Sequence, residues 1–75
     1  MRELLTDLEI KLLQTYADYN MHIHPTAQAI YYNPRTIYGI FARIWERTGC
    51  NPREFWGLME IMQQLEKDGV NGREE

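Results

Sequence analysis

The sequence predicts a small all-α protein, a single bundle of about four helices. Its 75 residues are 44% hydrophobic and 25% charged, which is ordinary for one globular domain. Each of the three prolines stands where an apolar pattern of helical period begins, and the first position of a helix tolerates proline. No stretch alternates apolar and polar residues as a strand would. We therefore expect one domain over 1–68 and a flexible polar tail over 69–75.

The first helix is expected over about 7–19. Thr6 can cap it, and Glu9, three residues later, can close a capping box. Leu5 and Ile10 stand where a hydrophobic staple would lie. Apolar residues then follow at helical spacing: Leu8, Leu12, Tyr16 and Tyr19.

The second helix is expected to be short, about 25–31, and to open at Pro25. Ala27, Ile30 and Tyr31 would face inward.

The third helix is expected over 34–47, with Asn33 as its cap and Pro34 as its first residue. Gly49 is a natural stop for it. One apolar stripe would be buried: Ile37, Ile40, Phe41 and Ile44.

The fourth helix is expected over 52–67, capped by Asn51, opened by Pro52 and ended by Gly69. Glu54 would lie in its favourable first turn. Its buried residues would be Phe55, Leu58, Met59, Met62 and Leu65.

The order of these elements predicts a helix-turn-helix arrangement. A short helix, a tight turn and a longer helix are braced by a helix on either side. Only about three residues, 31–33, separate the second and third helices. So short a connection holds the two helices at a steep angle and leaves one face of the third helix free.

The charge is divided along the chain. The net charge is −3, but residues 20–53 carry four arginines against Glu46 alone, and both flanking segments are acidic. Such segregation can give an acidic protein a local basic surface, which suits a nucleic-acid partner. The alternative interpretation is that the arginines only solvate exposed faces.

The predicted outer face of the third helix carries the residue types that contact DNA. Arg35 lies in the first turn, where recognition helices reach base edges, and Thr36 can hold a phosphate. Arg43, Arg47 and Arg53 suit contacts to the phosphate backbone. The candidate DNA-binding residues are Arg35, Thr36, Tyr38, Gly39, Ala42, Arg43 and Arg47.

Two residues of this face, Gly39 and Glu46, do not clearly favour DNA binding. Gly39 and Ala42 are small enough for close approach to a groove wall, but Gly39 could instead serve tight packing against another helix. Glu46 on the same face would repel phosphate.

The stretch 27–38, followed by Phe41, Ile44, Thr48 and Gly49, resembles the C-terminal helix-turn-helix domain of the PucR family. These bacterial proteins regulate purine catabolism and, in close relatives, sugar diacid use. The resemblance covers roughly residues 8–65. It implies a DNA-binding regulator or accessory factor of bacterial or phage type, either a stand-alone protein or an excised domain.

The sequence departs from the family pattern inside the third helix. Asn33 stands at the family's usual histidine, Arg35 at its asparagine and Tyr38 at one of its arginines. Thr36 and Arg43 match the expected polar contacts. The resemblance therefore implies the fold more strongly than the sequence preference for DNA.

Other classes of function are disfavoured. No paired acid and base or activated nucleophile indicates an enzyme, and we expect no cofactor. His22 and His24 with Cys50 could make at most an incomplete zinc site, so we interpret them as loop residues and a bystander thiol. Trp45 and Trp56 could stack on nucleic-acid bases, but aromatics at this spacing are more often core or interface.

The expected partner is double-stranded DNA, bound by a monomer or a homodimer. The alternative is a helical protein-interaction module with the same fold that does not bind DNA and works through its acidic first and fourth helices. The N-terminus lacks a signal pattern, and no apolar run approaches the roughly 18 residues that cross a bilayer. We therefore expect a cytoplasmic location without membrane contact.

Overall fold

The computed structural model describes the backbone of residues 2–74 and the side chains of residues 3–67. This part of the chain contains helices and no strand, as predicted. The elements are the 3₁₀ helix η1 (Arg2–Leu4) and the α-helices α1 (Asp7–Asp18), α2 (Ile23–Ile30), α3 (Pro34–Thr48) and α4 (Phe55–Glu74).

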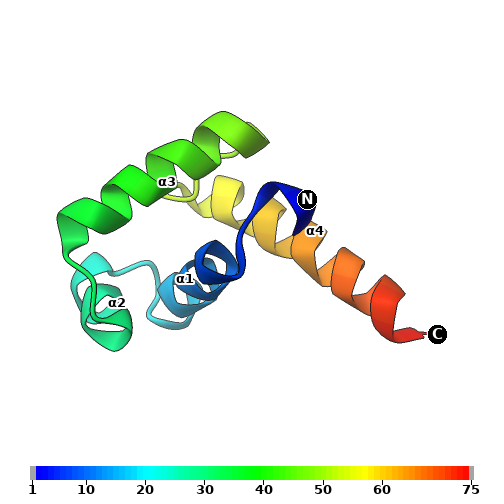
Figure 1. The fold of residues 1–75 in the computed structure, drawn as a ribbon, viewed down its shortest axis with the longest axis horizontal. Helices are drawn as coiled ribbons and strands as arrows, with labels where there is room; N and C mark the ends of the chain where they lie inside the picture. The colour runs from blue at the N-terminus through cyan, green and yellow to red at the C-terminus, as the bar shows by residue number, and fades with distance from the viewer. Residues whose placement is uncertain (1, 75) are drawn as a thin grey trace.

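The helices surround one core. Figure 1 shows α3 along the top of the view, with α1 and the first turns of α4 beneath it and α2 below its start. The Tyr16 and Phe41 rings, from α1 and α3, meet in the core with centroids 4.8 Å apart. Five leucine and isoleucine side chains that are 0% exposed come from α1, α3 and α4: Leu12, Leu13, Ile37, Ile44 and Ile61.

The predicted start of α1 is confirmed. The Thr6 amide donates to Glu9 Oε1 at 2.9 Å, and the Glu9 amide donates to Thr6 Oγ1 at 3.1 Å. Leu5 and Ile10 are both buried beside this capping box. The predicted inner stripe is only half right, because Leu8 and Tyr19 are each 43% exposed. The buried face turns instead toward Ile10 and the adjacent pair Leu12 and Leu13.

Helix α2 begins at Ile23, two residues before the predicted start at Pro25. Proline costs nothing there, because the amides of the first helical turn have no partner within the helix. Thr26 reinforces this earlier start, since its amide and hydroxyl both donate to the His22 carbonyl, at 3.4 and 2.7 Å.

Tyr31 does not face inward, as the sequence suggested. It ends α2 in the left-handed conformation, with φ of 61°, and its side chain is 92% exposed. Ala27 is buried and Ile30 partly buried, as predicted. The connection to α3 consists of residues 31–33, which confirms the short turn.

The predicted boundaries of α3 are close to those observed. Asn33 Oδ1 accepts from the Arg35 amide at 2.8 Å, and Pro34 is the first helical residue. Gly49 ends the helix with φ of 78°, a conformation that glycine adopts without steric cost. The predicted stripe is buried: Ile37, Ile40, Phe41 and Ile44.

Helix α4 begins at Phe55, so the predicted start at Pro52 is wrong. Asn51 caps an isolated turn instead: its side chain accepts from the Arg53 amide at 3.0 Å, and its carbonyl accepts from the Glu54 amide at 3.1 Å. A Cβ on Gly57 would lie 2.1 Å from the Asn51 carbonyl oxygen. The first turn of α4 thus passes directly against residue 51, and the chain must turn between them before the helix can begin.

The buried face of α4 also differs from the prediction. Leu58 and Leu65 are buried as expected, and Ile61, which was not predicted, is fully buried. Phe55 is 54% exposed, and Met59 and Met62 are partly buried. The helix continues past Gly69 to Glu74. The flexible tail stays a prediction, because residue 75 and the side chains from 68 onward lie outside the described residues.

Candidate nucleic-acid interface

The face of α3 opposite its buried stripe is open to solvent. Five of the candidate DNA-binding residues lie exposed there: Arg35, Thr36, Gly39, Ala42 and Arg43. At 100° per residue they cover about a third of the helix circumference. The structure therefore brings these five together on one surface.

The start of α3 concentrates positive potential. Its first turn holds no acidic residue, and the positive end of the helix dipole lies there. Arg35 is exposed, and in the part of the chain that the structure describes no carboxylate pairs with its guanidinium. This end of α3 can therefore attract an anionic partner.

The middle of the face is shallow and unobstructed. A Cβ built on Gly39 would meet no atom within 4 Å. Packing among the described residues therefore does not require this glycine, so a close contact with another helix in that part of the chain does not explain it. With the exposed Ala42 one turn later, a groove wall could approach the α3 backbone closely.

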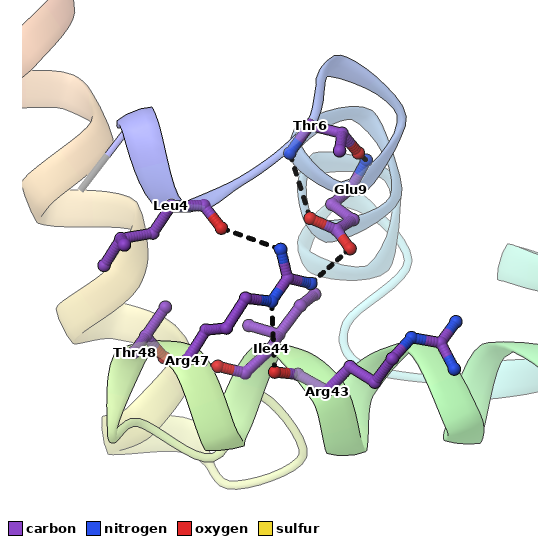
Figure 2. A network of polar contacts seen from close by, with 7 residues as sticks. All are labelled: Leu4, Thr6, Glu9, Arg43, Ile44, Arg47 and Thr48. Carbon is purple, nitrogen blue, oxygen red and sulfur yellow. Dashed lines mark hydrogen bonds and ion pairs between the residues drawn. The ribbon is translucent and has the colours of Figure 1, made fainter.

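Arg43 and Arg47 differ sharply, although they are one turn apart. Figure 2 shows the Arg43 side chain extending along α3, away from the polar network of Leu4, Thr6, Glu9 and Arg47. Arg47 lies inside that network: its guanidinium forms an ion pair with Glu9 and donates to the Leu4 carbonyl at 2.8 Å. Arg47 thus joins the end of α3 to the start of α1 and does not lie on the open face.

The Glu9 carboxylate is held ionised by its partners. Partial burial raises the pKa of Glu9, but hydrogen bonds from Arg47 and from the Thr6 amide outweigh it and bring the pKa below its usual value. One carboxylate therefore caps α1 and anchors α3. The capping role follows from the sequence, whereas the contact with Arg47 crosses 38 positions and carries no local signal.

Tyr38 and Arg53 form a unit on one flank of α3. The Arg53 guanidinium carbon lies 4.3 Å from the centroid of the Tyr38 ring, which is a cation–π contact. Beside them, Trp45 is 50% exposed and contributes to a hollow of about 290 Å³ that Ala42 also lines. Arg53, from the turn before α4, thus adds an exposed guanidinium beside this flank of α3.

The histidines, the cysteine and the tryptophans that the sequence offered as site residues are not brought together. Among the described residues, no three of His, Cys, Asp and Glu lie close enough to hold a metal ion. Trp56 is 78% exposed on α4, whereas Trp45 belongs to α3, and neither is part of the core. Nor does the described part contain a helix with the length and hydrophobicity needed to cross a bilayer.

Comparison with known proteins gives no relative. No family model, curated protein or solved structure matches the chain. The resemblance to the PucR family is therefore still a hypothesis, and the features that bear on function are those of the α3 surface.

Proposed function

We propose that this chain is a DNA-binding helix-turn-helix module, a transcriptional regulator or accessory factor that places α3 in the major groove. The observation that supports this most is the outer face of α3, where Arg35 and Arg43, neither of them paired with an acidic side chain among the described residues, flank the open backbone at Gly39. A major groove admits one α-helix, and small residues let the helix axis come close to the base edges.

In this proposal, different residues contact the bases and the phosphates. Arg35, in the first turn, reads a guanine edge, and Thr36 holds a phosphate through its hydroxyl and its amide. Arg43 and Arg53 contact phosphates on the two flanks of α3. Tyr38 orients Arg53 through the ring contact at 4.3 Å.

The first test is titration with a library of DNA duplexes at several salt concentrations. We expect affinity to fall steeply with salt, because each phosphate contact contributes a slope of about −0.9 in log K against log salt. Arg43→Ala should weaken binding to all sequences and reduce that slope by about 1. Arg35→Ala should cost about 1–3 kcal/mol and relax the preference at one base pair.

Two controls make this test specific. Gln63→Ala, at an exposed position of α4, should leave binding unchanged, whereas Glu46→Gln should strengthen it by removing a negative charge from the α3 face. Absence of binding by the folded protein at low salt would refute the proposal. Equal losses from Gln63→Ala and Arg43→Ala would show that α3 is not the contact.

Gly39→Ala separates stability from binding. Because a Cβ at this position meets nothing within 4 Å, the change should raise the free energy of unfolding by up to about 1 kcal/mol. If α3 approaches the groove closely, the same methyl group should weaken DNA binding severalfold. Urea denaturation and the duplex titration measure the two effects. A variant that is both more stable and unimpaired in binding would place the groove elsewhere.

A second candidate function is a protein-interaction module that does not bind DNA. Its support is the exposure of Phe55 and Trp56, which are 54% and 78% exposed at the start of α4. The affinity of a mainly apolar protein interface would change far less with salt than the affinity that phosphate contacts provide.

A further inference from the structure

A mainly apolar groove lies between the end of α1 and the start of α4. It encloses about 280 Å³. Ala17 and Met21 line one side, and Phe55, Met59 and Met62 line the other. Asn20 adds a polar atom to an otherwise hydrophobic lining. No residue of α3 takes part, so this groove is separate from the proposed DNA surface.

Large aromatic side chains stand exposed at the α4 side of this groove. The Phe55 and Trp56 rings meet edge to face, with centroids 5.0 Å apart, and remain largely in solvent. Exposed apolar patches on small monomeric proteins mark interaction sites, and tryptophan is enriched among the residues that dominate binding energy. The flexible thioethers of Met59 and Met62 can adapt to the side chains of a partner.

The charge around the groove is acidic. Together, α1 and residues 54–67 carry six acidic residues against two lysines. Asp18 directly follows the lining residue Ala17, and Glu66 lies on the same helical stripe as Met59 and Met62; both are exposed. An occupant would therefore meet a hydrophobic floor with a negative border.

We propose that this groove binds an amphipathic helix of a partner protein, with apolar anchors at i, i+3 or i+4 and i+7 and with lysines or arginines beside them. Helix-in-groove recognition uses this spacing, and the basic residues would complement Asp18 and Glu66. A second copy of the chain is a poorer occupant, because a symmetric contact would set one acidic border against another. The proposal does not depend on DNA binding.

The test uses two designed helical peptides of about 18 residues, or five turns. They share an apolar face of leucines and differ only in carrying lysine or glutamate beside it. Binding is followed through the two indole N–H signals of the protein in NMR spectra. We expect the lysine peptide to bind at least tenfold more tightly and to shift the Trp56 signal but not that of Trp45.

Charge exchange provides the decisive comparison. Asp18→Lys with Glu66→Lys should reverse the preference, so that the glutamate peptide binds more tightly. Glu46→Lys makes the same chemical change on α3 and should leave the preference for the lysine peptide almost intact. Met59→Gln should weaken binding about tenfold at unchanged border charge, and thermal melts verify that each variant is folded.

Several results would overturn the proposal. They are equal affinity for the two peptides, an effect of Glu46→Lys as large as that of Asp18→Lys with Glu66→Lys, and a shift of the Trp45 signal in place of the Trp56 signal. Self-association of the protein that buries Trp56 would assign the groove to a second copy. In each case the duplex titration still tests the DNA proposal, because the Met59 and Glu66 variants leave α3 unchanged.

Discussion

Gly57→Ala is expected to lower the free energy of unfolding by about 3 kcal/mol, at the upper end of the usual cost of overpacking. The added Cβ would lie 2.1 Å from the Asn51 carbonyl oxygen, 2.8 Å from its carbon and 2.9 Å from its nitrogen. All three are backbone atoms, so no side-chain rotation can relieve the collision. The start of α4 would have to move away from the turn before it, and with it the packing of Leu58.

Gly39→Ala is the matched control, since both glycines are helical and only Gly57 touches another segment. Helix propensity alone would make both substitutions stabilising by up to about 1 kcal/mol. Urea denaturation should instead give changes of opposite sign. If Gly57→Ala proved as stable as Gly39→Ala, the close passage of α4 over residue 51 would be refuted.

Arg47→Ala is expected to lower the free energy of unfolding by about 2 kcal/mol, because it leaves Glu9 without its ionic partner. Removal of one member of a fully buried pair costs about 3–5 kcal/mol. The smaller value applies here because the Arg47 side chain is 37% exposed and solvent screens the pair. A cycle with Glu9→Gln should show a coupling between the two residues, whereas additive losses would contradict the contact.

The same pair predicts a dependence on pH. The folded-state pKa of Glu9 lies below its usual value, so its contribution to stability is complete above the unfolded pKa of about 4.3. That contribution is lost as the pH falls through the lower folded-state pKa. Glu9→Gln should therefore lose less stability than the parent protein on acidification below about pH 5. If the free energies of unfolding of the two proteins fell in parallel with decreasing pH, this contribution of Glu9 to stability would be excluded.

Local signals predicted α1 and α3 well. The Thr6–Glu9 capping box, the Asn33 cap and Gly49 each act within four residues, so the sequence alone places them. The start of α4 depends on the passage of Gly57 against Asn51, which is a tertiary contact. By its local sequence, Pro52 is an equally suitable first helical residue. Nothing nearby in the sequence distinguishes a helix start at Pro52 from one at Phe55.

Among the surface residues, too, local patterns predict some positions, whereas tertiary contacts determine others. The buried stripe of α3 determines which residues face outward, so Arg35, Gly39 and Arg43 could be placed from periodicity. The anchoring of Arg47 could not, because its partner Glu9 comes from another helix. Periodicity alone places Phe55 and Met59 in the core and therefore does not predict the apolar groove, whereas the structure buries Ile61 in the core.

In the turn between α2 and α3, Tyr31 holds an unfavourable backbone conformation that a substitution would relieve. Tyr31 adopts φ of 61° while its side chain is 92% exposed, so burial of the ring does not offset the cost of that backbone conformation. For a residue other than glycine, this cost is about 1–2 kcal/mol. Glycine at position 31 would recover part of it, and mutations that alter the α3 face at some cost in stability could then accumulate without unfolding the domain. Position 31 is thus a starting point for the directed evolution of new binding specificities on this scaffold.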